Sequence, residues 1–234
     1  MKRPLILILL IAFAMLGSSC AQKGSHLFIL SGQSNMAGLD PDISFIPAVS
    51  QRFGAENVIV VKDALGGQPI RRWHKDWSLR ESDDPKQIGD LYDQLLSKVQ
   101  PAYEGKKVQT VTFLWMQGER DAREGLADRY IDSFEGIITQ LEGDLRRKDI
   151  NIVMGRLSDF DMENKTYPHW TRIRDLQVAF ADSKANAAWV DTDDLNTGLN
   201  KQGNQIKDDL HYSVSGYKLF GERLAEKAIQ LIEK

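Results

Sequence analysis

The chain has 234 residues, of which 42% are hydrophobic and 27% are charged, and its formal net charge is −3. This length suits one domain that can bury a full core, and this composition excludes a disordered or membrane-embedded chain. A mildly acidic chain lacks the basic balance of nucleic-acid-binding domains, so no nucleic-acid partner is expected.

The N-terminal segment has the layout of an export signal. A short basic start precedes an apolar run over residues 5–16, and small residues follow at 17–19. The run is shorter than the roughly 20 apolar residues that span a bilayer, and the order basic, apolar, small is typical of a secretory signal. We therefore expect residues 1–19 to be a signal peptide, residues 20–25 a tether and residues 26–234 the functional domain. A buried N-terminal helix is the alternative.

Cys20 is the only cysteine, so neither an intrachain disulfide nor a cysteine metal cluster can form. Its position directly after the small residues resembles the lipobox of bacterial lipoproteins, although Gly17 stands where that motif usually has an aliphatic residue. The resemblance implies lipidation of Cys20 and an exported protein anchored in the bacterial cell envelope, with no other link to a membrane. Simple cleavage, which would give a periplasmic or secreted protein, is the alternative. Loss of residues 1–19 leaves a net charge of about −5.

After the signal, short apolar runs alternate with amphipathic stretches. The runs, taken in chain order, cover residues 27–30, 57–62, 108–115, 150–157 and 187–191. Apolar residues recur at helical spacing in residues 88–100, 126–145, 172–181 and 215–232. Uninterrupted apolar runs of this length favour parallel strands buried on both faces. The alternation predicts an α/β fold, a three-layer α/β/α sandwich around a mainly parallel five-stranded sheet.

The loops after the first three predicted strands are rich in glycine and polar residues. They comprise residues 31–35, 65–68 and 117–119. In an open parallel sheet, ligands bind beyond the carboxyl ends of the strands. We therefore expect these three loops to converge on one edge of the sheet and to form the site.

Ser34 lies in a tight turn between a predicted strand and a predicted helix, a position that exposes a hydroxyl and directs free N–H groups toward it. A plain N-cap serine is the alternative, and Ser31 is a competing serine closer to the strand.

A serine nucleophile needs a base. Of the four histidines, only His211 has a carboxylate three residues earlier on a loop, at Asp208. This spacing lets Asp208 accept the Nδ1–H of His211 and leaves Nε2 to take the serine proton. An acidic helix entry with an incidental histidine is the alternative.

Acyl transfer also needs donors for the oxyanion, each typically worth about 2.7–4 kcal/mol. The N–H groups of Ser34 and Gly67 and the side-chain amide of Gln117 are the candidates, and an ordinary turn is the alternative explanation for the glycine pair. No His/Asp cluster has the spacing of a metal site, which disfavours a metal-dependent deacetylase.

Together these segments resemble the SGNH hydrolases, and within them the branch of sialate O-acetylesterases and the acetylxylan esterases of carbohydrate esterase family six. The resemblance rests on G-Q-S-N-M at residues 32–36, G-G-Q-P-I at 66–70 followed by a tryptophan at 73, W-M-Q-G-E-R-D at 115–121 and D-D-L-H at 208–211. It implies a flavodoxin-like sheet, an acyl-serine mechanism, and no metal or other cofactor. The roles that the resemblance implies are nucleophile for Ser34, base for His211, orienting acid for Asp208, and oxyanion donors for Gly67 and Gln117.

The same resemblance leaves two carboxylates open. Glu119 either orders the site through hydrogen bonds or shares the carboxylate role. Asp209 is a weaker substitute for Asp208, because it is one residue closer to His211. Gln68 departs from the threonine expected after the glycine pair, which puts the local pocket shape in doubt.

The implied function is a serine esterase that removes O-acetyl groups from a carbohydrate such as acetylxylan or a sialic acid. Trp73 and Trp77 are candidates to line the substrate cleft, with packing inside their loop as the alternative. If Arg71 or Arg72, just past the glycine loop, faced the site, an anionic sugar such as a sialic acid would be favoured. Two other functions stay open. A lipase or thioesterase of the same superfamily would need an apolar acyl groove, and an inactive carbohydrate-binding surface lipoprotein would bind a glycan without releasing acetate.

Overall fold

The computed structural model of the protein describes residues 24–234. The predicted signal peptide and Cys20 therefore lie outside the described residues. The first strand begins at Ser25, whose N–H donates to the carbonyl of Lys107 at 2.8 Å. The last residue of the predicted tether thus belongs to the sheet.

Five parallel strands form the central sheet, in the order β2-β1-β3-β4-β5. The strands are β1 (Ser25–Gly32), β2 (Val58–Ala64), β3 (Val108–Met116), β4 (Ile150–Gly155) and β5 (Ala187–Val190). This is the flavodoxin-like order, in which the chain reverses direction across the sheet at β1 and β3. The predicted five-stranded parallel sheet is confirmed.

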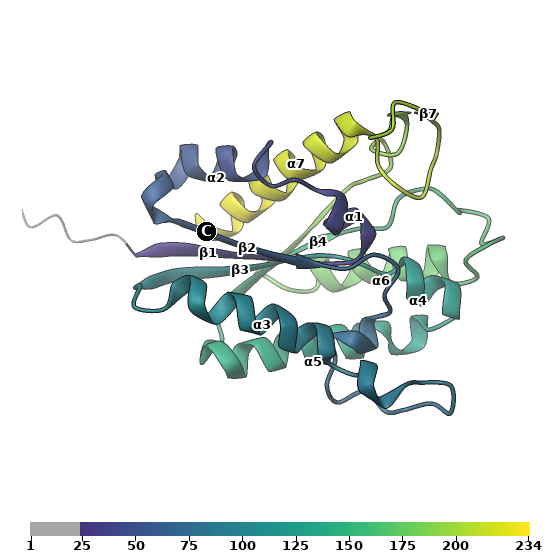
Figure 1. The fold of residues 1–234 in the computed structure, drawn as a ribbon, viewed down its shortest axis with the longest axis horizontal. Helices are drawn as coiled ribbons and strands as arrows, with labels where there is room; N and C mark the ends of the chain where they lie inside the picture. Colours follow the sequence, from purple (N-terminus) through teal and green to yellow (C-terminus); the bar gives the residue numbers. More distant parts are fainter. Residues whose placement is uncertain (1–23) are drawn as a thin grey trace, which may run out of the picture.

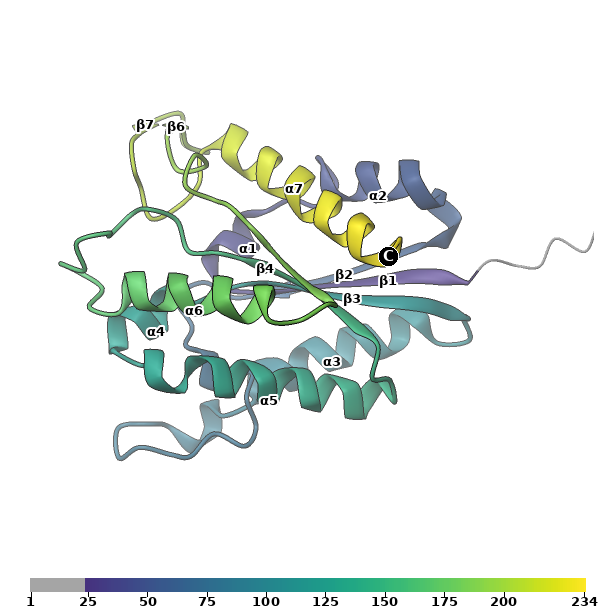
Figure 2. The ribbon, with the colours of Figure 1, turned by 180° about the vertical axis from the view of Figure 1, so that it is seen from behind.

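Helices cover both faces of the sheet (Figure 1). Helices α2 and α7 pack against each other on one face, and α3, α5 and α6 lie on the other, as the reverse view also shows (Figure 2). The helices are α1 (Ser34–Gly38), α2 (Phe45–Phe53), α3 (Asp90–Tyr103), α4 (Glu119–Glu124), α5 (Ala127–Leu145), α6 (Trp170–Asp182) and α7 (Val214–Ile232). Short 3₁₀ helices are η1 (Ala55–Asn57), η2 (Ile70–Arg72) and η3 (Pro85–Gln87), and a small hairpin consists of β6 (Gly198–Leu199) and β7 (Gln205–Ile206).

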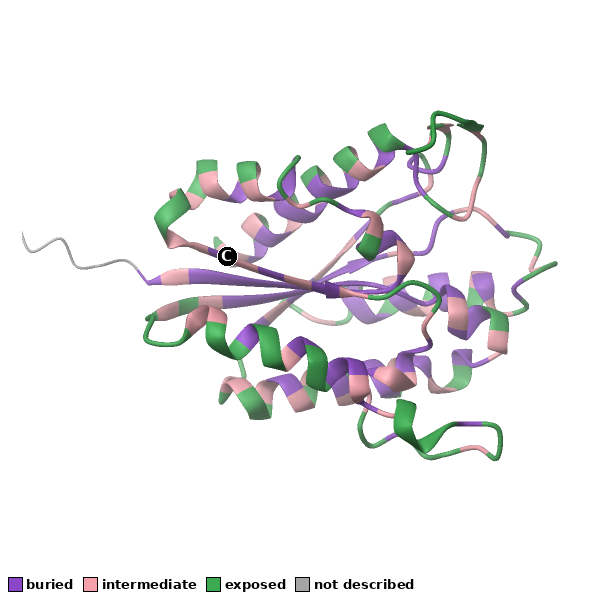
Figure 3. Cartoon of the chain, viewed as in Figure 1, coloured by how far each residue is buried: buried purple, intermediate pink, exposed green. Residues whose placement is uncertain are grey.

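Burial follows the position of each strand in the sheet (Figure 3). The interior strand β1 is buried from His26 to Gly32, because helices cover both of its faces. The edge strand β2 instead alternates between buried and half-buried residues, although its residues 58–61 form an uninterrupted apolar run. Helices α3 and α2 cover the two faces of this edge strand only in part. The strand is therefore not buried on both faces, contrary to what its apolar sequence had predicted.

Two helices contain prolines that the helical pattern of the sequence did not include. Helix α3 continues past residue 100 through Pro101 to Tyr103, and the short helix α2 has Pro47 in its first turn. Proline is tolerated in a first turn because the N–H groups there have no helical partner. Within residues 24–234, we find no helix whose length and apolarity would let it cross a membrane.

Candidate active site

The end of β1 places Ser34 at the carboxyl edge of the sheet. Gly32 pairs with Ala64 of β2 and Met116 of β3, so the three strands end at the same level. Gly32 has a φ of 138°, and a Cβ there would lie 2.0 Å from the carbonyl oxygen of Met116. Only glycine fits this close approach. The chain then turns through Gln33, whose N–H donates to the same carbonyl at 2.8 Å, and Ser34 begins α1.

Ser34 and His211 line the same cavity, which has a volume of about 370 Å³. The loops after β1, β2 and β3 all contribute to it, as the sequence predicted, and the segments before α6 and α7 supply the rest of its wall. The lining residues are Gln33, Ser34, Gly66, Gly67, Glu119, Arg120, Arg123, Tyr167, Leu210 and His211. The structure therefore brings together the predicted nucleophile, the predicted base, one predicted oxyanion donor and the predicted supporting carboxylate.

The glycine pair lies directly against the nucleophile turn. A Cβ on Gly66 would be 3.5 Å from the Cβ of Ser34, so this loop is in van der Waals contact with the serine. Gly67 has a φ of 73°, a left-handed conformation that favours glycine, and open space lies beyond its Cα. Its backbone is therefore accessible from the cavity, as an oxyanion donor requires.

His211 lies in a half-exposed position, with Asp209 as its nearest carboxylate. The Nδ1 atom of His211 is 3.9 Å from Oδ1 of Asp209, and the same oxygen accepts the backbone N–H of His211 at 2.9 Å. Asp208 instead contacts Thr197, whose hydroxyl lies 3.4 Å from its carboxylate and accepts its backbone N–H at 3.1 Å. The role of Asp208 as orienting acid stays a prediction, and Asp209 is the carboxylate that this structure holds beside the base.

Gln117 is completely buried and is not part of the cavity wall. Its amide nitrogen donates to the carbonyl of Gln68 at 3.1 Å and to the carboxylate of Asp121. Both N–H bonds of the amide thus have partners within the protein. To serve as an oxyanion donor, Gln117 would have to exchange one of these bonds, so that role also stays a prediction.

Two buried carboxyl groups follow β3. Burial raises the pKa of Glu119 to about 7, although the hydrogen bond that Asn35 donates to it, at 3.1 Å, acts to lower this pKa. Burial likewise raises the pKa of Asp121 to about 7, and Asp121 accepts the backbone N–H of Ile70 at 2.9 Å. Asp121 therefore ties the segment after the glycine pair to α4, whereas Glu119 lies at the cavity.

The two candidate substrate tryptophans do not lie at this cavity. Trp73 is 1% exposed and packs edge-on against Trp115 with ring centroids 5.2 Å apart. Trp77 is 6% exposed, donates from Nε1 to Asp83 at 2.8 Å and lies under the guanidinium of Arg129. Both tryptophans therefore pack within the protein, which was the alternative to stacking on a sugar. The reason is that residues 73–78 are bonded to Gln140 and Arg129 of α5 rather than lying over the site.

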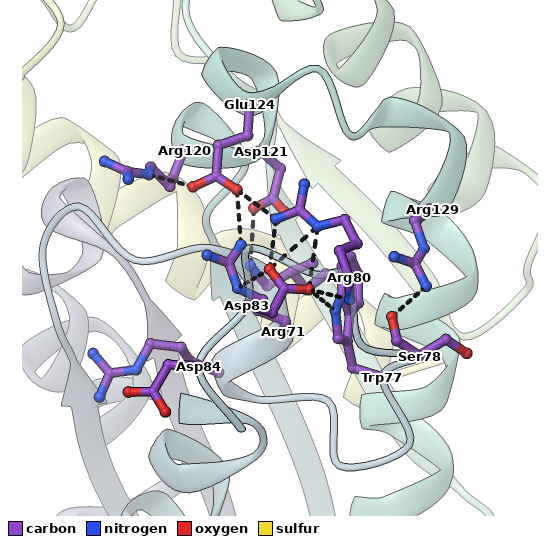
Figure 4. A network of polar contacts seen from close by, with 12 residues as sticks. Arg71, Trp77, Ser78, Arg80, Asp83, Asp84, Arg120, Asp121, Glu124 and Arg129 are labelled. Carbon is purple, nitrogen blue, oxygen red and sulfur yellow. Dashed lines mark hydrogen bonds and ion pairs between the residues drawn. The ribbon is translucent and has the colours of Figure 1, made fainter. Parts of the chain in front are cut away.

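A network of ion pairs holds this loop to α4 (Figure 4). Glu124 accepts from Arg71 at 2.8 Å, from Arg80 at 3.1 Å and from Arg120 at 2.7 Å. Asp83 bonds Arg80 at 2.7 Å, and the guanidinium of Arg80 is the main cause of an Asp83 pKa far below its ordinary value. Arg71, near the glycine loop, is therefore occupied in this network and is not among the cavity residues.

The cationic residues at the cavity are instead Arg120 and Arg123, and the sequence reasoning missed both, as it missed Tyr167. Arg120 pairs with Glu124, whereas the guanidinium of Arg123 forms no ion pair with another side chain between residues 24 and 234. Arg120 and Arg123 are three residues apart and closely follow Gly118, where a helix could be expected to begin. This spacing is the signal that could have placed both side chains on one helical face. Tyr167 comes from the long segment between β4 and α6, where no local pattern marks it.

Across the described part of the chain, no group of three or more His, Cys, Asp or Glu side chains is arranged to hold a metal ion.

Comparisons with known proteins agree with this architecture. The family model described as "carbohydrate esterase, sialic acid-specific acetylesterase" matches residues 37–230. A search of curated proteins gave no significant match. Among solved structures, a protein from Arabidopsis thaliana is 20% identical with a TM-score of 0.66, over 89% of this chain and 99% of that one.

Two further solved structures share the fold. A carbohydrate acetylesterase from Xanthomonas citri is 18% identical with a TM-score of 0.59, over 89% of this chain and 56% of that one. NanS is 14% identical with a TM-score of 0.61, over 89% of this chain and 97% of that one. At these identities the structures support the fold alone. The family match covers most of the chain, so the chain belongs to the carbohydrate esterases of the sialic acid-specific acetylesterase family and is a carboxylic ester hydrolase.

Proposed function

We propose that this enzyme removes O-acetyl groups from a carbohydrate through an acetyl-serine intermediate formed on Ser34. The observation that carries this proposal is the shared cavity, which places Ser34 at the start of α1, Gly67 in the adjacent loop and His211 along one wall. The cavity is small, with a volume of about 370 Å³, which suits an acetyl group on a sugar better than the long acyl chain of a lipase or thioesterase substrate.

In the proposed mechanism, His211 takes the proton of Ser34 as the hydroxyl oxygen attacks the acetyl carbonyl carbon. The N–H groups of Ser34 and Gly67 donate to the resulting oxyanion. When the tetrahedral intermediate collapses, the bond to the sugar oxygen breaks and His211 returns the proton to that oxygen. Water, deprotonated by His211, then attacks the acetyl-serine and releases acetate, which restores the hydroxyl.

The variant Ser34→Ala tests the nucleophile. We expect acetate release to fall by at least about 10³-fold, since the loss of a catalytic serine removes the covalent route. The melting temperature should stay close to that of the wild type, because Ser34 is half-buried at a helix start. Acetate release is measured on acetylated xylan, acetylated sialic acids and simple acetylated sugars. Activity retained by the variant would overturn the mechanism, and binding without acetate release by the wild type would favour the inactive lectin-like alternative.

We further propose that the preferred sugar is anionic, as in an acetylated sialic acid. Arg123 supports this, because it lines the cavity and forms no ion pair with an acidic side chain among the described residues, and Arg120 lines the same cavity. An anionic sugar would pair with this charge on binding, whereas a neutral xylan unit would not.

The variant Arg123→Gln tests the substrate class. We expect KM for an acetylated sialic acid to rise about 5- to 30-fold, in line with the loss of one charged hydrogen bond, while KM for a neutral acetylated sugar changes little. Arg52→Gln, an exposed arginine on α2 that pairs with Glu233, is the matched control and should alter neither value. Equal effects on both substrates would remove the case for an anionic sugar and leave the esterase mechanism intact.

A further inference from the structure

Asn35, the residue directly after Ser34, connects three distant parts of the chain. Its side chain is buried, with 1% exposure. Its amide nitrogen donates to Oε1 of Glu119 and to the carbonyl of Leu210, each at 3.1 Å, and its amide oxygen accepts the hydroxyl of Tyr217 at 3.2 Å. These partners belong to α4, to the segment that carries the base, and to α7.

The contacts use the amide as both donor and acceptor. A side-chain amide has two N–H donors and one carbonyl oxygen, and here all three functions have a protein partner. Aspartate at this position could accept from Tyr217 but could not donate, and it would bring a second carboxylate against Glu119. A buried apolar side chain would leave the carbonyl of Leu210 without this partner. The site therefore selects an amide of this length.

The contact to Leu210 bears directly on the base. The carbonyl of Leu210 and the N–H of His211 belong to the same peptide unit. Asn35 donates to that carbonyl, and Asp209 accepts that N–H at 2.9 Å. Both polar groups of the peptide are thus fixed, which sets the direction in which the Cα–Cβ bond of His211 leaves the backbone.

This backbone control matters because the imidazole has little packing of its own. The side chain of His211 is 49% exposed, so surrounding side chains restrict it only in part. Proton transfer needs the imidazole within hydrogen-bond reach of the serine hydroxyl, and a displacement of 1 Å can cost about 10²-fold in rate. The orientation of the Leu210–His211 peptide therefore contributes to the geometry of the pair.

We propose that Asn35 is a positioning residue that couples the nucleophile turn to the base, by holding the peptide before His211 in register with Ser34. The proposal rests on the proposed function, in which Ser34 and His211 act as nucleophile and base. Asn35 itself touches neither the acetyl group nor the reacting atoms, so its effect is exerted through His211.

The test is a double-mutant cycle with 4-nitrophenyl acetate as substrate. In the wild-type background, Asn35→Ala should lower kcat about 10- to 100-fold with KM within about threefold, because geometry and not binding is lost. In a His211→Ala background, the same substitution should change the residual rate by less than about twofold, because the group that it positions is absent. Equal factors in the two backgrounds, or an unchanged kcat in the first, would overturn the proposal.

Asn186→Ala is the matched control for the loss of a side-chain amide. Asn186 also donates to a backbone carbonyl, that of Ile150 at 2.8 Å, but it lies at the opposite edge of the sheet where β4 begins. We expect Asn186→Ala to lower the melting temperature without changing kcat. If Asn186→Ala lowered kcat as much as Asn35→Ala does, the loss of kcat in Asn35→Ala would be explained by reduced stability alone, and the proposal would fail. If Asn35→Ala does not fold, the smaller change Asn35→Ser replaces it in the same cycle with the same expected outcome. A wild type inactive toward the ester, or an active Ser34→Ala variant, would instead refute the proposed function.

Discussion

At the scale of single residues, two neighbouring aspartates, Asp208 and Asp209, are candidates to orient His211. The spacing of three residues favours Asp208, whereas the structure holds Asp209 beside the imidazole at 3.9 Å. The carboxylate of Asp209 already accepts the backbone N–H of His211. This hydrogen bond forms a local turn that restricts the carboxylate. Asp208 has a φ of 47°, a strained conformation for a residue other than glycine, and its contact with Thr197 is long at 3.4 Å. Strain of this kind concentrates at functional sites.

We therefore expect Asp208→Asn to lower kcat by about 10²–10⁴-fold, as when the carboxylate that fixes the tautomer of a catalytic histidine is lost. Asp209→Asn should cost about 10-fold or less, because it weakens a local turn next to the base. The kcat values of the two variants on one acetyl ester decide between them. A larger loss for Asp209→Asn would transfer the orienting role to that residue.

At the scale of elements, the end of β1 is the feature on which the site depends most. The close approach of Gly32 to Met116 lets the chain leave the sheet and start α1 within two residues. Asp121 and Glu124 then fix η2 and the loop after it against α4, which places the glycine pair beside Ser34. Each of these contacts joins the end of one strand to the loop of its neighbour.

The pair of variants Gly32→Ala and Gly143→Ala tests this dependence. At Gly32, a methyl group meets a backbone oxygen at 2.0 Å and the φ of 138° disfavours any side chain, so we expect a loss of about 2–5 kcal/mol in the free energy of unfolding. Gly143 lies exposed in α5 with no atom within 4 Å of an added Cβ, so alanine should stabilise the protein by about 0.5–1 kcal/mol. Urea unfolding measures both values. An equal effect of the two substitutions would contradict the close approach.

At the scale of the whole molecule, the doubly wound sheet explains why residues far apart in the chain meet. The order β2-β1-β3 puts the loops after the first three strands side by side, and α7 brings the segment before it to the same edge. The cavity is thus assembled from residues 33, 34, 66, 67, 119, 120, 123, 167, 210 and 211. The family match over residues 37–230 extends across the same assembly.

The sequence by itself determined the five strands, four of the helices, the edge at which the glycine-rich loops meet, and the presence of Ser34 and His211 at that edge. It could do so because apolar periodicity and turn residues are local properties, and because parallel strands place their carboxyl ends together. Only the tertiary structure decided that Trp73 and Trp77 are packed away from the cavity, that Gln117 is buried, that Asp209 lies beside His211, and that Arg120, Arg123 and Tyr167 line the wall. These outcomes depend on contacts between side chains distant in sequence, such as Asn35 with Leu210 and Tyr217, and no local pattern specifies which of several polar partners a buried group will meet.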